Sequence, residues 1–425
     1  MRVLLVGGGG REHALAWKIA QSPRLTHLVA APGNPGIARH ARCVAIKDTA
    51  VDEMVALAGR ERIDLVVVGP EVPLSLGLSD RLREAGIAVF GCSQAAARLE
   101  SSKAYSKSLM ARYRIPTARF ETFEDAAAAR RYCRELGVPL VVKADGLAAG
   151  KGAIICRTFE EADGAVRICL EEGAFGAAGR RIVIEEFMEG EEASCFVISD
   201  GTSVLPLVPA QDHKTIFDDD RGPMTGGMGA YSPVPAMDEA LGRRVMEEIA
   251  APVFAAMARE GAPYAGVLFV QIMITKDGPR VVEFNCRFGD PECQTILPLL
   301  DEDILPIFEA AAHGRGLPAS LRWRSGSSVC VVLASPGYPG TVRSGDEIIG
   351  LDAEGGLSGG VNVFHAGTAR RDERLVTAGG RVLGVQAHGA DVRSALAAAY
   401  AGVERIGFPG MQFRSDIGRR AVEPT

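Results

Sequence analysis

Short apolar runs alternate with helical stretches through the first hundred residues, and this order restricts the fold more than any other feature. The run Val3–Val6 ends at four glycines, and a helical stretch from His13 to Gln21 follows. Further strands and helices of the same series are expected at 28–31, 52–60, 64–68, 78–85 and 87–90. Strands that alternate with helices in this way pair in parallel. The sequence therefore predicts a parallel, Rossmann-like α/β domain in residues 1–100.

The remaining residues form further units, since a chain of 425 residues exceeds what one core usually organises. A helix over 101–113 is followed by a unit that contains a glycine-rich turn between two strands. The last hundred residues show short strands separated by glycine and proline turns, and one helix. The predicted domains are residues 1–100, 101–122 with 191–325, 123–190 as a lid subdomain, and a small α+β domain at 326–425.

Charge and cysteine content exclude several classes of protein. The net charge is −6, and lysines and arginines do not cluster as they do on nucleic-acid surfaces. The nine cysteines show neither zinc-site nor disulfide spacing, which indicates reduced thiols. No apolar stretch is long enough to span a membrane. We therefore expect a cytoplasmic protein that binds no nucleic acid and no membrane.

The first glycine turn, Gly7–Gly10, resembles a dinucleotide-binding loop but lacks its pattern. That pattern requires glycine where Glu12 stands. What remains is a turn that leads into a helix N-terminus, which suits a phosphate or another anion; a tight turn without a ligand is the alternative. The loops 33–36 and 69–71 also follow apolar strands. All three should gather at the carboxyl edge of one parallel sheet, where binding sites form.

A second glycine-rich segment, residues 143–152, has the sequence KADGLAAGKG. It is not a P-loop, because the glycine spacing is too short and Gly152 stands where serine or threonine is required. The residues that follow are strand-like, so the segment joins two strands. Such a hairpin can fold over ATP phosphates, with Lys143 and Lys151 neutralising oxygens. An ordinary flexible hairpin is the alternative.

Near residue 285, polar side chains alternate along an apolar strand. Glu283, Asn285 and Arg287 share one face by the two-residue period of a strand. A carboxylate and an amide oxygen two residues apart suit Mg²⁺, and an arginine beside them can bind a phosphate. The alternative is the exposed polar face of an edge strand. The acidic turn after the strand 181–186 could hold a nucleotide between two subdomains, although solvated acids are common there.

Two loops, 211–214 and 225–231, are rich in donors and glycines. Glycines allow backbone to approach a small ligand such as an amino-acid carboxylate closely. Taken singly, each loop has a structural explanation.

Together these segments resemble the ATP-grasp ligases and, within them, the phosphoribosylamine–glycine ligase family. The resemblance spans essentially the whole chain. It is carried by GGREHA at 9–14, APGN at 31–34, VGPE at 68–71, the 143–152 loop, QDHK at 211–214, the segment 222–233, EFNCRFGDPE at 283–292 and FHAGT at 364–368. It implies an ATP-grasp fold preceded by the parallel α/β domain and followed by the α+β domain.

The resemblance also implies an activity. Glycine would be joined to 5-phosphoribosylamine with ATP as co-substrate and Mg²⁺ or Mn²⁺ as cofactor, through a glycyl phosphate, in purine biosynthesis. Only small-molecule partners are expected, and a monomer is the default. The alternatives are another ATP-grasp carboxylate–amine ligase with different substrates and a nucleotide-binding regulatory protein without turnover. A biotin-dependent carboxylase would need a carrier lysine in its own motif, which the sequence lacks.

Roles for individual residues follow from the same resemblance. The expected ATP-binding residues are Lys103, Lys143, Gly146, Gly150, Lys151, Gly152, Glu185, Phe187, Met188 and Glu192. The expected metal ligands are Glu283 and Asn285, and the expected catalytic residues are Arg287, Asp212 and Lys214. The expected substrate-binding residues are Gly9, Gly10, Arg11, Asn34, Pro70, Glu71, Thr225, Gly226, Gly227, Met228 and Gly229.

Two positions depart from the expected pattern. Gln271 stands on the preceding strand, where many ATP-grasp enzymes place an acidic metal ligand, which disfavours a second ion held fully by protein. Cys293 replaces a more usual hydroxyl residue. The whole interpretation requires that the lysine-bearing hairpin near 150 and the strand near 285 face each other across one nucleotide cleft.

Overall fold

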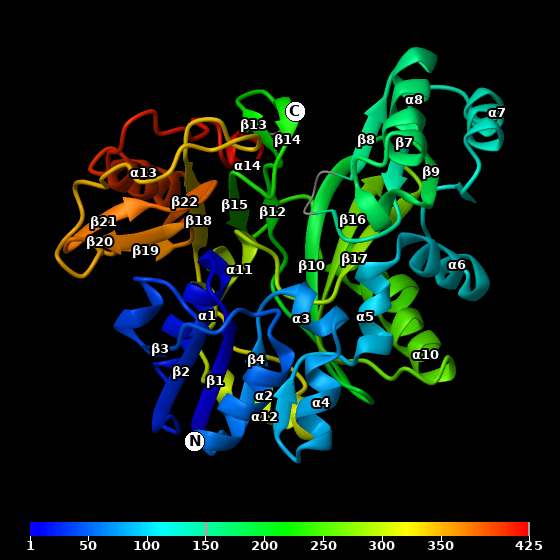
Figure 1. Cartoon of the computed structure of the whole chain (residues 1–425). Coiled ribbons are helices and arrows are strands. Elements are labelled where there is room, and N and C mark those ends of the chain that lie inside the picture. Colours follow the sequence, from blue (N-terminus) through cyan, green and yellow to red (C-terminus); the bar gives the residue numbers. More distant parts are fainter. Residues whose placement is uncertain (149–151, 424–425) are drawn as a thin grey trace.

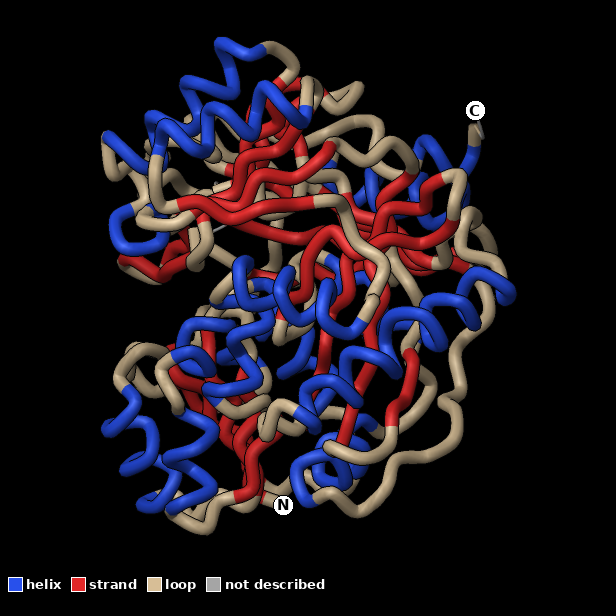
Figure 2. Tube along the Cα trace, turned by 90° about the vertical axis from the view of Figure 1, so that its right-hand side faces the viewer, coloured by secondary structure: helices blue, strands red, loops and turns tan. Residues whose placement is uncertain are grey.

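The structure is a computed structural model that describes residues 1–148 and 152–423. Figure 1 shows a parallel sheet near the N-terminus, a second sheet built largely from the last hundred residues, and a third group of strands, β7–β9, on the other side of the molecule. The long strands β10, β16 and β17 run between these parts. Figure 2 shows helices flanking the strands over much of the surface.

The N-terminal sheet is parallel, with strand order β3-β2-β1-β4-β5. Its strands are β1 Arg2–Gly7, β2 His27–Pro32, β3 Arg42–Cys43, β4 Leu65–Val68 and β5 Ala88–Phe90. Its helices are α1 Gly10–Ile19, α2 Val51–Arg60, α3 Glu71–Ser75, α4 Leu78–Glu84 and α5 Gln94–Ser101. Strand β4 is buried along its whole length, as expected for a parallel strand with both faces covered. The predicted parallel α/β domain is confirmed.

A four-stranded antiparallel sheet of order β11-β10-β16-β17 forms the centre. Its strands are β10 Glu191–Asp200, β11 Val204–Pro206, β16 Ala265–Thr275 and β17 Gly278–Asn285. The helices of this part are α6 Lys103–Tyr113, α9 Glu239–Val245, α10 Ala251–Arg259, α11 Glu292–Ile296 and α12 Ile304–His313. One apolar cluster joins Leu4 of the N-terminal sheet to Leu268 and Phe284 here, so the two sheets share a core.

A second four-stranded sheet, of order β6-β9-β7-β8, carries the glycine-rich hairpin. Its elements are β6 Phe120–Phe123, α7 Ala126–Leu136, β7 Leu140–Ala144, β8 Ala153–Cys156, α8 Phe159–Val166 and β9 Ile182–Glu186. Strands β7 and β8 pair antiparallel, with Lys143 opposite Ala153, so the predicted hairpin is confirmed. Its own apolar cluster includes Leu140, Val142 and Ile184.

The C-terminal sheet has the order β12-β15-β18-β22-β19. Its strands are β12 Gln211–Asp212, β15 Gly229–Ser232, β18 Ser327–Ala334, β19 Val361–His365 and β22 Arg381–Gly389. Helix α13, Val392–Val403, packs on it, and two hairpins flank it: β13 Thr215–Phe217 with β14 Arg221–Met224, and β20 Thr368–Arg371 with β21 Arg374–Thr377. The predicted α+β unit is confirmed, and two strands from 211–232 complete its sheet.

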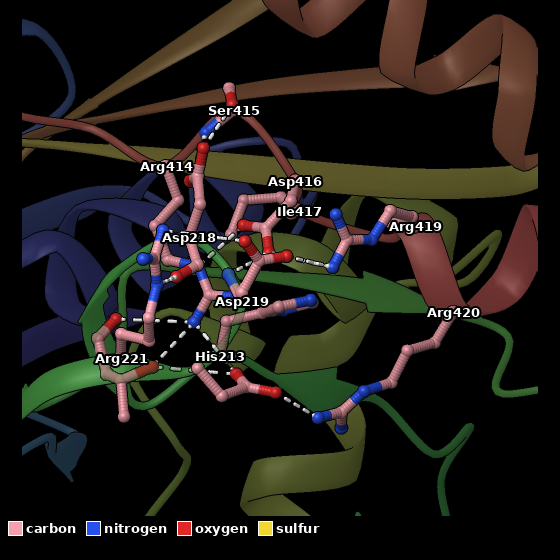
Figure 3. A network of polar contacts seen from close by, with 12 residues as sticks. His213, Asp218, Asp219, Arg221, Arg414, Ser415, Asp416, Ile417, Arg419 and Arg420 are labelled. Atoms are coloured by element: carbon pink, nitrogen blue, oxygen red, sulfur yellow. Dashed lines mark hydrogen bonds and ion pairs between the residues drawn. The ribbon is translucent and has the colours of Figure 1, made fainter.

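A network of charged side chains holds the hairpin β13–β14 to the end of the chain (Figure 3). We call it the C-terminal clamp. Buried Arg414 donates to Thr215 Oγ1 at 2.8 Å, to Asp220 Oδ1 at 3.0 Å and to Asp416 Oδ2 at 2.7 Å. Helix α14, Arg419–Val422, adds two pairs, Arg419 with Asp219 and Arg420 with Asp220.

Helices long and apolar enough to cross a bilayer are absent from the described residues. Eight of the nine cysteines are buried, and all nine are free thiols, as expected.

Candidate active site

The glycine-rich hairpin and the strand near 285 lie together. Lys143 lies near the end of β7, and its ammonium donates a hydrogen bond to the carbonyl oxygen of Val282 on β17 at 3.2 Å. This contact confirms that the first lysine of the hairpin faces the acid–amide–arginine strand. Gly150 and Lys151 lie outside the described residues. Gly146 and Gly152 lie within them, and the carbonyl of Gly152 accepts from the N–H of Ala144 at 2.8 Å.

A buried ion cluster surrounds the same lysine. Glu185 Oε2 lies 3.0 Å from Lys143 Nζ and 3.0 Å from Lys107 Nζ. Lys107 also donates to Thr117 Oγ1 at 2.7 Å. We call Lys107, Lys143 and Glu185 the hinge cluster. Burial acts against the ionised form of Glu185, but the two lysines hold the pKa of its carboxyl below the usual value.

The other predicted nucleotide contacts lie in the turn between β9 and β10 and at the start of β10. Phe187 is half-buried, with the Arg157 guanidinium 6.0 Å from its ring centre, and Met188 is buried. Glu192 is the second residue of β10, and its carboxylate accepts from Gln271 Nε2 at 2.7 Å. Burial raises the pKa of Glu192, which lies close to Asp212 and Glu283. The adenine and ribose roles of these residues stay predictions.

Arg287 is held by oxygens from three segments. Its guanidinium lies 3.2 Å from Glu71 Oε2 and 3.1 Å from Glu100 Oε1, and it donates to Asn285 Oδ1 at 3.1 Å. The last contact agrees with the prediction that Asn285 and Arg287 share a face. Burial raises the pKa of Glu100 to about 7, although Arg287 opposes the shift.

Glu283 lies in a positive environment. Burial acts against its charge, but Lys103, Lys143, Lys214 and Arg287 lower the pKa of its carboxyl. Two of the three lysines predicted to bind ATP, Lys103 and Lys143, therefore lie close enough to the predicted metal ligand to act on its charge.

The donor atoms of Glu283 and Asn285 fit a hard divalent ion. One carboxylate and one amide oxygen are too few to hold Mg²⁺ or Mn²⁺ alone, and such ions complete their shell with phosphate oxygens and water. Within residues 1–148 and 152–423, no three His, Cys, Asp or Glu side chains are grouped to hold a metal. Gln271 pairs directly opposite Glu283, as expected, and its amide is bound to Glu192. The site thus suits an ion that arrives with a nucleotide.

The predicted catalytic residues Asp212, which is buried, and Lys214, which is half-buried, form an ion pair. Lys214 Nζ lies 2.8 Å from Asp212 Oδ2. Burial would lower the pKa of Lys214, but Asp212, Glu192 and Glu292 raise it. Burial and Asp212 raise the pKa of Glu292 to about 7, while its Oε1 accepts from Ser194 Oγ at 3.0 Å. A second cluster of ionisable groups therefore adjoins the predicted metal ligand.

The three loops at the carboxyl edge of the parallel sheet gather as predicted. The N–H of Gly33 donates to Gly7 O at 3.1 Å, and a Cβ on Gly7 would lie 3.0 Å from Pro70. The Asn34 amide donates to Gly8 O at 2.9 Å and to His365 O at 2.8 Å, while its oxygen accepts from the N–H of Ile37. The Asn34 side chain is therefore fully engaged within the protein.

The helix end at α1 is less open than the sequence suggested. The N–H of Gly9 donates to Glu12 Oε2 at 2.7 Å, and the N–H of Arg11 donates to Asp290 Oδ2 at 3.4 Å. Protein carboxylates thus occupy two of the donors that were expected to face an anion. Gly10 lies beside the carboxylate of Asp290, since a Cβ at this position would be 3.6 Å from Asp290 Oδ1. The Arg11 side chain donates to Glu12 Oε1 at 2.6 Å.

The loop 225–229 divides into two parts. Gly226 and Gly227 direct their carbonyls to Arg381 of β22, at 2.8 and 3.5 Å, and Gly227 has φ +116°, which favours glycine. Thr225 Oγ1 donates to Lys214 O at 2.7 Å. By contrast, Met228 packs in an apolar cluster with Ile216 and Val332. Met228 and the adjoining strand residue Gly229 thus belong to the packing of the C-terminal sheet.

Sequence reasoning missed several residues that the structure brings here, namely Lys107, Glu100, Glu292, Asp290 and Arg381. Lys107 lies four residues after Lys103 on one helix, a spacing that places both side chains on the same face. That spacing is a usable signal. Arg381 gave no such signal, because it lies on β22, 155 positions after its partner Gly226. Cys293 is buried, with its sulfur 3.8 Å from Arg11 O.

Comparison with known proteins agrees with this arrangement. Models of the phosphoribosylglycinamide synthetase N domain, ATP-grasp (A) domain and C domain match residues 1–100, 101–293 and 328–420. A phosphoribosylamine–glycine ligase of Mesorhizobium japonicum is 52% identical over 422 residues, covering 99% of both chains. One of Caulobacter vibrioides is 52% identical over 425 residues, covering 100% of this chain and 99% of the relative.

Solved structures show the same fold. The crystal structure of phosphoribosylamine–glycine ligase from Thermotoga maritima has a TM-score of 0.87 at 33% identity, covering 98% of this chain and 100% of that one. A biotin carboxylase from Campylobacter jejuni has a TM-score of 0.74 at 16% identity, covering 97% and 93%, and shows the fold alone. With all three domain models matched and half of its residues identical to relatives over their full length, the chain belongs to the phosphoribosylglycinamide synthetase family.

Proposed function

We propose that this chain joins glycine to 5-phosphoribosylamine, with ATP hydrolysed to ADP and phosphate, in purine biosynthesis. The single observation that carries the proposal is the position of Lys143. Its ammonium lies between Glu185 and the carbonyl of Val282, one residue before Glu283. A phosphate that bound to this lysine would also lie near Glu283, Asn285 and Arg287. The family membership supports the substrate pair.

The first step transfers the γ-phosphoryl group to glycine. An oxygen of the glycine carboxylate forms a bond to phosphorus, and the bond to the bridging oxygen of ADP breaks. Lys103, Lys143 and Arg287 offset the negative charge on the transferring group and on ADP. Arg287 is paired with Glu71 and Glu100, and these pairs orient its guanidinium before the substrate binds. Positioning and electrostatics supply catalysis here, since phosphoryl transfer needs little covalent help.

The second step forms the amide bond. The amine nitrogen of phosphoribosylamine attacks the acyl carbon of glycyl phosphate, inorganic phosphate leaves, and the nitrogen loses a proton. Asp212 is the candidate for orienting this amine, with Lys214 holding its carboxylate at 2.8 Å. Glu292, whose pKa is raised by burial, is a second carboxyl beside this position. Exclusion of water protects the acyl phosphate from hydrolysis.

A divalent ion held by Glu283 and Asn285 together with the nucleotide would supply further charge neutralisation at the phosphates. Mg²⁺ and Mn²⁺ both suit this oxygen donor set. We further propose the predicted domain limits, with residues 123–190 acting as a lid, and a monomeric, cytoplasmic protein.

The test is a substrate panel in which ADP formation is measured and the product is identified by mass. ADP should appear only when glycine and phosphoribosylamine are both present, and the product mass should equal that of glycinamide ribonucleotide. Alanine in place of glycine, and ammonia in place of phosphoribosylamine, serve as matched controls. Equal turnover with either control would contradict the proposed substrate pair.

A further inference from the structure

Lys107 is a buried lysine for which the proposed chemistry gives no role. It lies on α6, and only 2% of the residue is exposed. Its ammonium has two oxygen partners, Glu185 Oε2 at 3.0 Å and Thr117 Oγ1 at 2.7 Å. Burying a charged lysine is costly unless it is paired. Solubility therefore does not explain why a lysine stands at position 107.

The hinge cluster joins two parts of the molecule. Glu185 and Lys143 lie on neighbouring strands β9 and β7 of the second four-stranded sheet. Lys107 lies on α6, which packs with α10 and β17 of the central part. Thr117, the other partner of Lys107, in turn donates to Val281 O of β17 at 2.7 Å. Lys107 thus connects the Glu185 carboxylate to the central sheet.

The two lysines of the cluster differ in what they can do when a nucleotide binds. Lys143 contacts Glu185 but also lies beside the predicted metal strand, where phosphates are expected. An ammonium drawn toward phosphate oxygens interacts less strongly with Glu185. Lys107 is also held by Thr117, at 2.7 Å, which would keep its ammonium beside the carboxylate. Lys107 is therefore the cation that keeps Glu185 ionised and oriented in the loaded site.

One atom of the cluster is left without a partner. Glu185 Oε1 is buried and accepts no hydrogen bond from the described part of the chain. Buried carboxylate oxygens are rarely left unpaired in proteins, so an exception calls for an explanation such as a ligand. An ionised carboxylate can only accept hydrogen bonds. The matching ligand group is a donor such as the exocyclic amino group of adenine, whereas guanine presents a carbonyl oxygen at the same ring position.

We propose that Lys107 is a positioning residue that holds Glu185 as a charged acceptor for the base amino group, and thereby makes the site prefer adenine to guanine nucleotides. This inference rests on the proposed function, since it takes the hinge cluster to adjoin the nucleotide. It goes beyond that function by assigning base selectivity to a residue on a different element from those that touch the base. Lys107 acts only through Glu185.

The test measures binding of ADP and of GDP by titration calorimetry, without glycine or phosphoribosylamine. In Lys107→Met, ADP should bind about tenfold or more weakly, the effect of losing one charge-assisted hydrogen bond. GDP binding should change less, so the preference for ADP should fall. Lys107→Arg keeps the cation and should restore part of the preference. Thermal unfolding of each variant checks that the protein is folded.

Arg280→Met is the matched control. Arg280 of β17 pairs with Glu186 at 2.7 Å and donates to Thr117 O at 2.6 Å, so it also connects the central sheet to β9 but does not touch Glu185. It should leave the ADP-to-GDP ratio within about twofold, because exposed or half-exposed pairs contribute little.

A double variant gives a second measure. In a Glu185→Gln background, adding Lys107→Met should change ADP affinity much less than it does in the parent protein, because coupled residues are not additive. An unchanged ADP-to-GDP ratio in Lys107→Met would overturn the proposal, as would an equal loss in Arg280→Met. Because turnover is not measured, ADP binding with the expected selectivity would stand even if the substrate panel failed.

Discussion

The hinge cluster and the C-terminal clamp each contain a buried cation with carboxylate partners, Lys107 or Lys143 in the first and Arg414 in the second, yet they differ in one respect. In the clamp, Arg414 finds oxygens on Thr215, Asp220 and Asp416, and the neighbouring carboxylates have arginine partners of their own (Figure 3). In the hinge cluster, three charged groups meet but one carboxylate oxygen stays open. The charged groups of the clamp bind one another, whereas the hinge cluster leaves one carboxylate oxygen without a partner among the described residues.

The contrast extends to the neighbours of each network. Beside the hinge cluster, Asn285 Nδ2 is also buried without an acceptor among the described residues, and Glu283 is surrounded by cations. Beside the clamp, one atom is open, His213 Nδ1. Open polar atoms that gather at one place indicate a binding site, because folding alone gives no reason to bury them. Variants should therefore lose activity in the first region and stability in the second.

The largest effect is expected from Glu283→Gln. The substitution keeps shape and removes the charge that the proposed divalent ion needs, so turnover should fall by about a hundredfold or more. The midpoint of thermal unfolding should move little. The measurement is ADP formation at saturating Mg²⁺, with Glu239→Gln, an exposed partner of Arg243, as the control. Activity close to that of the parent would show that Glu283 holds no ion, and the contrast between the regions would disappear.

Arg414→Met should act in the opposite way. It leaves Asp416, whose side chain is 8% exposed, without its main counter-ion, and the free energy of unfolding should drop by about 3 kcal/mol. Denaturant unfolding measures this loss. Arg420→Met removes only the exposed pair with Asp220 and should cost less than about 1 kcal/mol. If Arg414→Met unfolded like the parent protein but lost turnover, the clamp would belong to the active site.

The smallest effect concerns pH and sharpens the account of the clamp. Burial, with Arg414 nearby, lowers the pKa of His213 to about 4, against about 6.5 in an unfolded chain. Between these values the unfolded state binds a proton that the folded state does not, so stability falls as pH decreases from about 6.5 to about 4. His213 contributes at most about 1.4 kcal/mol per pH unit to this loss. Arg420, Asp212 and Asp416 also face the ring.

His213→Gln keeps an acceptor for the N–H of Gly418, which His213 Nε2 binds at 3.3 Å, but cannot titrate. Denaturant unfolding between pH 7 and pH 4.5 should therefore show the parent losing stability faster than the variant. The buried His13 and His365 are present in both proteins and cancel in the difference. A constant difference across this range would mean that the pKa of His213 is the same in the folded protein as in the unfolded chain.

Much of the fold could be predicted because its strands are continuous apolar runs bounded by turns. The strand expected at 64–68 is β4, Leu65–Val68, and the β7–β8 hairpin was expected from the segment 143–152. Strands β12 and β15 carried no such signal. They are two and four residues long, and β15 is a strand because it pairs with β18, while β12 pairs in turn with β15. Pairing across about a hundred residues leaves no local pattern.

The candidate site divides in the same way. Glu283, Asn285 and Arg287 could be identified because strand periodicity fixes their common face. For Lys107 the sequence shows only its spacing of four residues from Lys103 on one helix, and the tertiary contact with Glu185 is what gives it a role. No pattern in the sequence indicates that a carboxylate covers the helix end predicted to be open at Gly9–Arg11. Asp290 reaches it from 279 positions away.

The pairing of β15 with β18 has a practical consequence for anyone who would divide this protein. A fragment ending near residue 325 would keep β12 and β15 but lose the strand that completes their hydrogen bonding, and with it Arg381, which fastens Gly226 and Gly227. The same cut would strip the apolar face of Tyr231 from its packing partners. Although three family models divide the chain neatly, we expect the part that ends near residue 325 to be much less stable alone than within the whole chain.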